Sequence, residues 1–323
     1  MLLAVLIIGK QMKRDLISVV IPVYGDKKLV KILYEKLVSV FSRMPVDYEI
    51  IEVCDACPYG SADEIRKLAK KDKRVKFINL SRNFGQHLAI KAGLDYASGD
   101  YTVVMDCDLQ DNPEDIVRLY EKIKTAKVDA VFGAREKRED SFFKKICSKA
   151  AHYLIYGLSD FRYFNTQDTG TFSIFTKQVL RMLQENNEPY FVFMHVIFWA
   201  GFNVDSIEVL RTKRFIGKSG YNFLKGFNFF QKSLTSNSNK PLIFAGMCSF
   251  LMFVFCGLFI LKLLFDYFVF GQRLLGWTSI MISIFFIAAL LFAYLGILGV
   301  YIGQIFKMSQ GRQIYVIKEK ANL

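Results

Sequence analysis

Two aspartates separated by a single residue, Asp106 and Asp108, come directly after the apolar stretch YTVVM at residues 101–105. A short apolar run of this kind predicts a buried β-strand, so both carboxylates are expected at its exposed end. Carboxylates at positions i and i+2 can reach one hard cation. Mg²⁺ or Mn²⁺ usually takes one or two carboxylates and completes its coordination with water and substrate phosphates. Solvated turns also contain this spacing, so its meaning depends on the surrounding elements.

Polar residues also follow the other predicted strands of the chain. They are found in IPVYGD (21–26), at Asp55, in LSRNFG (80–85) and in GAR (133–135). The hydrophobic patterns predict strands over 17–22, 48–53, 75–80, 101–105 and 128–132, with helices over 28–43, 61–71, 84–97 and 113–125. This alternation predicts an α/β fold, a mostly parallel sheet with helices on both faces. Ligands of such folds bind beyond the carboxyl ends of the strands.

Two long apolar runs follow the predicted α/β part. Residues 242–261 contain no charge, and neither do the 33 residues from Leu274 to Phe306. Twenty helical residues span roughly 30 Å, the thickness of the hydrocarbon core of a bilayer. We therefore predict a catalytic domain over 1–214 and two transmembrane helices over 241–265 and 274–306. The intervening segments complete this plan as a juxtamembrane amphipathic segment at 215–240, a short external loop at 266–273 and a tail at 307–323.

The distribution of basic residues predicts the orientation of these spans. Lysine and arginine gather before the first span and after the second, whereas Arg273 alone lies between them. By the positive-inside rule, the catalytic domain and both termini are cytoplasmic, most simply at a bacterial inner membrane. The chain carries 43 basic and 30 acidic residues, a net charge of +13. Anionic lipid and a phosphorylated substrate account for that charge, so we expect a lipid bilayer and no nucleic acid as partner.

In combination, these motifs resemble the inverting nucleotide-sugar glycosyltransferases of family 2, which have an A-type fold. Within that family the chain is similar to the dolichol-phosphate mannose synthases and bactoprenyl-phosphate glucosyltransferases. The resemblance extends from residue 17 to about residue 318 and is strongest over 81–116. It implies a UDP- or GDP-sugar donor, a polyprenyl (undecaprenyl or dolichyl) phosphate acceptor, Mg²⁺ or Mn²⁺ as cofactor, and inversion at the anomeric carbon.

The resemblance also implies roles for individual residues. It assigns nucleotide-sugar binding to Pro22, Val23, Tyr24, Asp26, Asp55, Asp106, Gln110 and Arg214, metal binding to Asp106 and Asp108, and acceptor-phosphate binding to Arg135, Ser219 and Tyr221. The segment QDTGTF (167–172) matches a D-x-G-x-F motif and puts Asp168 at the reacting centre. Cys54, Thr171 and Gly220 depart from the family pattern, which indicates a divergent subfamily. A lipid phosphate is already largely anionic at neutral pH, so Asp168 is either a base or an orienting group.

Two other functions remain open at this point. A processive polysaccharide synthase uses the same catalytic fold, but it carries a Q-x-x-R-W motif that this sequence lacks. A catalytically silent membrane scaffold or flippase partner would have no need of Asp106, Asp108 and Asp168. The sequence leaves the oligomeric state open, a homo-oligomer included. We interpret Cys54 and Cys57 as reduced thiols and His87 as a packing residue, because neither has the spacing of a metal site.

Overall fold

The computed structural model describes residues 14–135, 169–188, 191–210 and 276–323, with scattered positions between 242 and 269. The chain divides into two compact units, which are described separately. The first contains Met1–Lys145, Phe161–Gly220 and Gln313–Leu323, and the second contains Ile146–Asp160 and Tyr221–Arg312.

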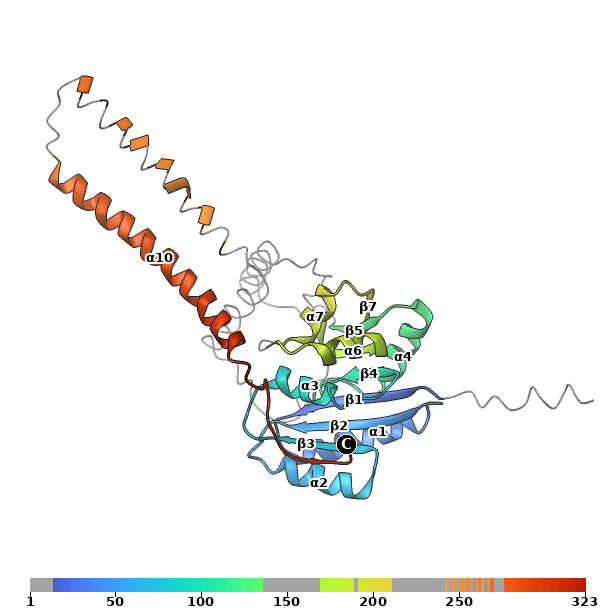
Figure 1. Cartoon of the computed structure of the whole chain (residues 1–323). Coiled ribbons are helices and arrows are strands. Elements are labelled where there is room, and N and C mark those ends of the chain that lie inside the picture. Colours follow the sequence, from blue (N-terminus) through green and yellow to red (C-terminus); the bar gives the residue numbers. More distant parts are fainter. Residues whose placement is uncertain are drawn as a thin grey trace, which may run out of the picture. The chain divides into compact units, whose positions relative to one another are not determined.

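The first unit is built on a single sheet (Figure 1). Within the described residues its strand order is β7-β5-β6-β4-β1-β2-β3-β8. The strands are β1 (Leu16–Val23), β2 (Asp47–Cys54), β3 (Val75–Leu80), β4 (Tyr101–Val104), β5 (Ala130–Arg135), β6 (Thr169–Thr176), β7 (Val204–Val209) and β8 (Ile317–Ala321). β4, β1, β2 and β3 run parallel, as do β5 and β7, whereas β6 and β8 run antiparallel to their neighbours. The prediction of a mostly parallel α/β sheet is confirmed.

Helices cover both faces of this sheet. One apolar cluster joins the sheet to α1 (Lys27–Phe41), α2 (Ser61–Lys71) and α4 (Asp115–Ala126). A second cluster joins the opposite face to α3 (Gln86–Leu94), α6 (Lys177–Glu185) and α7 (Phe193–Trp199). Strands that are covered on both sides have no solvent face, which is why the sequence shows continuous apolar runs instead of alternation.

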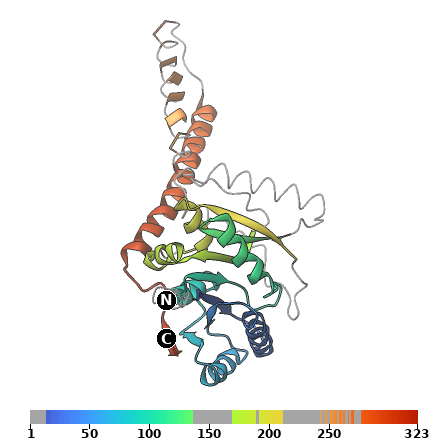
Figure 2. The ribbon, with the colours of Figure 1, turned by 90° about the vertical axis from the view of Figure 1, so that its right-hand side faces the viewer.

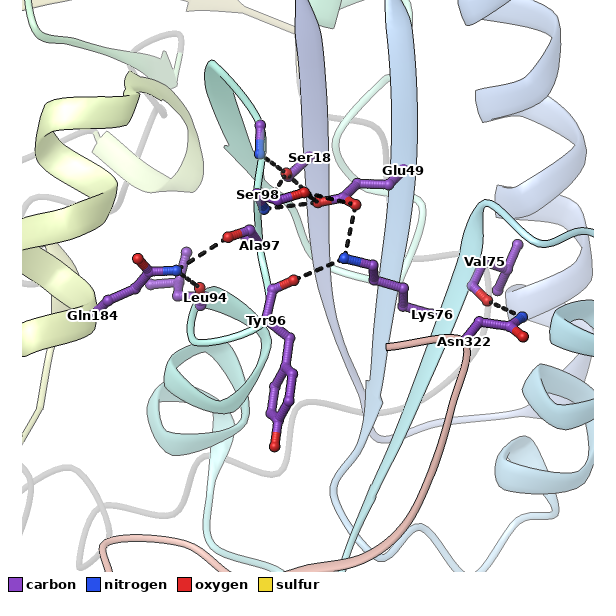
Figure 3. A network of polar contacts seen from close by, with 11 residues as sticks. Ser18, Glu49, Val75, Lys76, Leu94, Tyr96, Ala97, Ser98, Gln184 and Asn322 are labelled. Atoms are coloured by element: carbon purple, nitrogen blue, oxygen red, sulfur yellow. Dashed lines mark hydrogen bonds and ion pairs between the residues drawn. The ribbon is translucent and has the colours of Figure 1, made fainter.

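A buried polar network closes the amino-terminal ends of the parallel strands (Figure 3). Glu49, near the start of β2, accepts hydrogen bonds from Ser18 Oγ at 2.6 Å and from Ser98 N at 2.8 Å, and pairs with Lys76 Nζ at 2.8 Å. Burial alone raises the pKa of Glu49, but Lys76 and the hydrogen-bond donors lower it below its ordinary value. These polar groups bind one another and so stabilise the fold at this edge. A ligand is therefore expected at the opposite edge, where the carboxyl ends of the strands lie.

The second unit contains α10 (Trp277–Ser309), drawn in orange to red in Figure 1. Its Ser283–Phe306 portion is the only candidate membrane span among the described residues, judged by length and composition. This portion lies within the predicted second span at 274–306. The predicted first span at 241–265 is described only at scattered positions, which are helical, and the predicted juxtamembrane segment at 215–240 lies outside the described residues.

The last strand, β8, was not predicted. It lies within the predicted tail at 307–323, where Ile317–Ala321 pairs antiparallel with β3 and forms one end of the described sheet. Figure 2 shows this red strand returning to the sheet at the C-terminus. The segment IKEKA is too short and too polar to be recognised as a strand by its own pattern, because its stability comes from contacts with distant parts of the chain such as the edge of β3.

Candidate active site

The site is formed by loops that leave the carboxyl ends of the parallel strands. β1 and β2 are in register, so that Val23 lies opposite Cys54, and β4 continues the same edge on the other side of β1. Pro22 and Val23 are buried in the end of β1, whereas the Tyr24 side chain beyond them is 52 % exposed. The Asp26 carboxylate accepts a hydrogen bond from Lys28 N at 2.8 Å and caps α1, so it also has a structural role.

Asp55 holds the loop that follows β3. The residue is 3 % exposed, and its carboxylate accepts hydrogen bonds from Phe84 N at 2.7 Å and from Gly85 N at 2.8 Å. Burial raises the pKa of Asp55, while the two backbone donors and Arg82 act in the opposite direction. Gly85 has a φ of 96°, a conformation that favours glycine. The role implied for Asp55, contact with the nucleotide, remains a prediction, and the bonds to the loop are a second role that the resemblance did not indicate.

The two aspartates of the D-x-D motif follow β4, as predicted. Asp106, Asp108 and Gln110 are half-buried and alternate with the buried Cys107 and Leu109. The Oδ1 atom of Asp108 accepts a hydrogen bond from Gln110 N at 3.1 Å. The described residues contain no group of three or more His, Cys, Asp or Glu side chains that could hold a metal. Two carboxylates fit Mg²⁺ or Mn²⁺ whose other ligands are water and substrate phosphates, but they do not form an all-protein cage.

Sequence reasoning missed two contributors to this site. Gln86 Nε2 donates a hydrogen bond to Asp106 Oδ1 at 2.6 Å and links the β3 loop to the D-x-D motif. The Tyr59 ring is 61 % exposed and packs edge-to-face on Tyr24, with 6.2 Å between ring centroids. The position of Gln86 after the LSRNFG strand end was the only signal for the first contact. For Tyr59 the sequence contained no signal, because its neighbour Tyr24 follows β1 and Tyr59 itself lies in the loop after β2.

Several predicted site residues lie outside the described residues. These are Asp168, Arg214, Ser219 and Tyr221, and Arg135 is described only in its backbone at the end of β5. The strands that border these segments in the sequence, β5, β6 and β7, are described. β5 and β7 are parallel to β4, so they end at the edge that carries Asp106, and the antiparallel β6 begins there at Thr169. The roles of these five residues remain predictions.

Buried thiols and imidazoles near the site are poor candidates for the chemistry. Burial raises the pKa of the Cys54 thiol to about 11 and that of Cys107 to about 12. Burial lowers the pKa of His87 to about 4, and burial with the nearby His87 lowers that of His195 to about 4. At neutral pH the thiols are therefore protonated and the imidazoles uncharged, which agrees with the interpretation of His87 as a packing residue and of the cysteines as reduced thiols.

The fold and site define an α/β domain with paired carboxylates at the carboxyl edge of its sheet. The sequence pattern of glycosyl transferase family 2 matches residues 18–186. An uncharacterized glycosyltransferase of Bacillus subtilis, YkcC, is 31 % identical over 309 residues, covering 94 % of this chain and 93 % of the relative. The chain therefore belongs to glycosyl transferase family 2 and is a glycosyltransferase.

Other relatives and one solved structure are similar to the chain. The bactoprenol glucosyl transferase of Shigella phage SfX is 29 % identical, covering 94 % of this chain and 99 % of the relative. The putative glycosyltransferase CsbB of Bacillus subtilis is 30 % identical, covering 95 % and 93 %. Glucosyl-3-phosphoglycerate synthase of Mycobacterium tuberculosis, in complex with Mn²⁺, UDP-glucose and phosphoglyceric acid, has a TM-score of 0.49 and 15 % identity, covering 68 % of this chain and 78 % of that one.

Proposed function

We propose that the protein transfers one sugar from a UDP- or GDP-sugar to a polyprenyl phosphate at the membrane surface, with inversion at the anomeric carbon. The observation that carries the proposal is the joint position of Asp55, Asp106 and Asp108 at one edge of the sheet, with Gln86 between two of their loops. The relative named bactoprenol glucosyl transferase supports the choice of acceptor.

The proposed donor site would stabilise the negative charge that develops during the reaction. When the nucleoside diphosphate leaves the sugar, negative charge grows on its phosphates, and a divalent cation held by Asp106 and Asp108 would stabilise it. Gln86 holds one oxygen of Asp106 and so fixes the direction of that carboxylate. The proposed nucleophile is the acceptor's phosphate oxygen, which is already anionic at neutral pH, so the chain has no obligatory need for a general base.

The apolar surface of α10 supports a location in the membrane. Side chains along this helix remain open to the surroundings, including Phe285 and Phe292, each 71 % exposed. Soluble proteins rarely expose a continuous apolar surface of this length, whereas a helix in lipid gains from it. A membrane location raises the effective concentration of an acceptor whose phosphate lies at the headgroup plane.

The segment that connects β7 to β8 supports an even number of membrane crossings. β7 ends at Val209 and β8 begins at Ile317, and both belong to the same sheet. A folded domain lies on one side of a bilayer, so the segment between these strands must return to the side that it left. If α10 crosses the membrane, a second crossing is required, and the apolar run at 241–265 can supply it. The distribution of Lys and Arg supports a cytoplasmic location for the catalytic domain and both termini.

The proposal is tested with membranes that contain the full chain and a panel of radiolabelled sugar nucleotides. We expect a labelled product that is extracted with lipid and is labile to mild acid. Asp106→Ala should abolish the product, because it removes a proposed metal ligand, whereas Glu121→Ala, which removes an exposed carboxylate on α4, should leave it unchanged. Unchanged transfer by Asp106→Ala would refute the metal role. Label that enters only long polysaccharide would favour the synthase, and no turnover of any donor would favour the scaffold.

A further inference from the structure

The C-terminal segment 313–323 lies against the chain that leads into the candidate donor site. Its strand β8 pairs with β3 in the order Phe77–Ala321, Ile78–Lys320, Asn79–Glu319 and Leu80–Ile317, with an irregularity at the last step. β3 then continues directly into the loop 81–86. The C-terminal segment is thus the outer neighbour of the strand from which this loop emerges (Figures 1 and 2).

Side-chain contacts fix the C-terminal end of this segment, the end that lies farther along β8 from the loop 81–86. Both nitrogens of one edge of the Arg66 guanidinium donate to the Glu319 carboxylate, Nε and Nη2 each at 2.7 Å. Asn322 Nδ2 donates to Ala69 O at 2.6 Å and to Val75 O at 2.9 Å, and the second of these bonds is visible in Figure 3. A five-residue edge strand is weak alone, so these contacts with α2 and β3 account for its fixed register.

The near end of the segment contacts the loop itself. Ser81 N donates to Val316 O at 2.9 Å, which fixes the first residue of the loop. Tyr315 Oη donates to Asp95 Oδ2 at 2.7 Å, at the end of α3, the helix that follows the loop. The Tyr315 ring packs against the same apolar cluster as Phe84, a member of the loop.

The loop 81–86 is in turn hydrogen-bonded to the acidic residues of the site. Phe84 N and Gly85 N donate to Asp55, and Gln86 Nε2 donates to Asp106. A continuous series of hydrogen bonds and covalent links therefore connects Val316 to Asp106 through six residues. Shifts of about 1 Å at a binding group are enough to cost a large factor in activity, so a loop fixed at both ends matters for function.

We infer that the segment 313–323 is a positioning element of the donor site, which holds the loop 81–86 so that Gln86 and Asp106 bind the nucleotide sugar with its cation. The inference rests on the proposed function, since it takes Asp106 to be part of the donor site. It gives the C-terminus a role beyond that of a tail, because the stretch of chain that follows α10 completes the catalytic domain.

The test compares the full chain with a variant that ends at Arg312, both in membranes. The expected result is a rise of about ten-fold in the apparent KM for the sugar nucleotide, with a smaller change in kcat. Adding the synthetic peptide QIYVIKEKANL (313–323) should restore the KM, and a scrambled peptide should not. A segment needed only for folding would instead lower the amount of active enzyme and leave the KM of the remainder unchanged, which would overturn the inference.

Point variants keep the inference testable if the truncated chain does not accumulate. Tyr315→Phe removes the hydroxyl contact with Asp95, and Glu319→Gln weakens the pair with Arg66; each should raise the donor KM about three-fold. Lys318→Gln, on the exposed side of β8, is the matched control and should have the KM of the parent chain. Wild-type KM values in both test variants would overturn the inference.

A second measurement separates this inference from the proposed function. Hydrogen exchange of the amides in loop 81–86, followed by mass spectrometry of the full chain, needs no turnover. Faster exchange in Tyr315→Phe or in the truncated chain supports positioning even if no sugar nucleotide is consumed, in which case only the proposed function fails. Unchanged exchange in both, in an enzyme that transfers sugar, refutes the positioning role alone.

Discussion

Glu52 provides the sharpest physical prediction from this fold. The side chain lies on β2, is 1 % exposed, and neither of its carboxylate oxygens has a hydrogen-bond partner within the described part of the chain. Burial, with a smaller contribution from Glu64, raises its pKa from 4.5 to about 8. Glu49, three residues earlier on the same strand, shows the opposite case, because Lys76 and Ser18 stabilise its charge.

The raised pKa makes the stability contribution of Glu52 depend on pH. Below about pH 4.5 the carboxyl is protonated in both the folded and the unfolded state, so there is no penalty. Between pH 4.5 and 8 the unfolded chain loses this proton while the folded chain keeps it, and the free energy of unfolding falls by up to about 1.4 kcal/mol per pH unit. From pH 5 to pH 7 the loss amounts to about 2.5 kcal/mol.

The variant Glu52→Gln removes the titration and keeps the shape of the side chain. We expect its free energy of unfolding, minus that of the parent chain, to rise by about 2.5 kcal/mol between pH 5 and pH 7. For a domain of this size that difference corresponds to roughly 5–10 °C in thermal midpoint. Thermal unfolding of the detergent-purified chains at several pH values measures it, with Glu64→Gln as the control that removes the nearby charge, together with its ion pair to Lys67, and keeps Glu52. A difference that is constant over pH would mean that Glu52 ionises normally in the folded protein, and the reasoning would be refuted.

Substitutions at three further positions test the site and its support. Asp55→Asn places an amide against two backbone donors of the loop 81–86, so we expect a loss of about 1–3 kcal/mol in stability by denaturant unfolding and a rise in donor KM. Gly99→Ala would put Cβ 2.5 Å from Tyr101 O, so it should cost about 1–3 kcal/mol or more in the same assay while the donor KM of the folded fraction stays constant. Tyr59→Ala should raise the donor KM about five-fold, and Tyr59→Phe should not, if its exposed ring stacks on the nucleotide base.

The strands and helices up to residue 135 were largely predictable from the sequence. The expected strand at 75–80 and helix at 61–71 coincide with β3 and α2, and the expected strand at 17–22 lies within β1. Apolar contacts cover these elements on one or both sides. Each buried strand therefore has a continuous run of apolar residues, and each helix has apolar residues at helical spacing, so both can be recognised locally. The D-x-D motif was predictable for the same reason, because a carboxylate pair directly after a buried strand can only lie at the sheet edge.

The contacts of the site could not be predicted in this way. The bonds from Phe84 and Gly85 to Asp55 join residues about thirty positions apart, and every residue except proline has the backbone amide that donates such a bond. Because a backbone amide does not depend on the residue type, no sequence pattern predicts such a bond. The sequence also gives no indication that Glu52 is buried without a hydrogen-bond partner among the described residues, because it shows only one acidic residue within a predicted strand.

The sequence alone determined the order of strands and helices up to residue 135, the family resemblance and the acidic residues of the site, because hydrophobic periodicity and short motifs are local properties. Only the tertiary structure decided that the last residues of the chain form β8 beside β3, more than two hundred positions away in sequence. It also decided that Gln86 contacts Asp106 and that Glu52 has no partner among the described residues. Each depends on which strands become neighbours, and neighbours are selected by the packing of the whole sheet, not by any single segment.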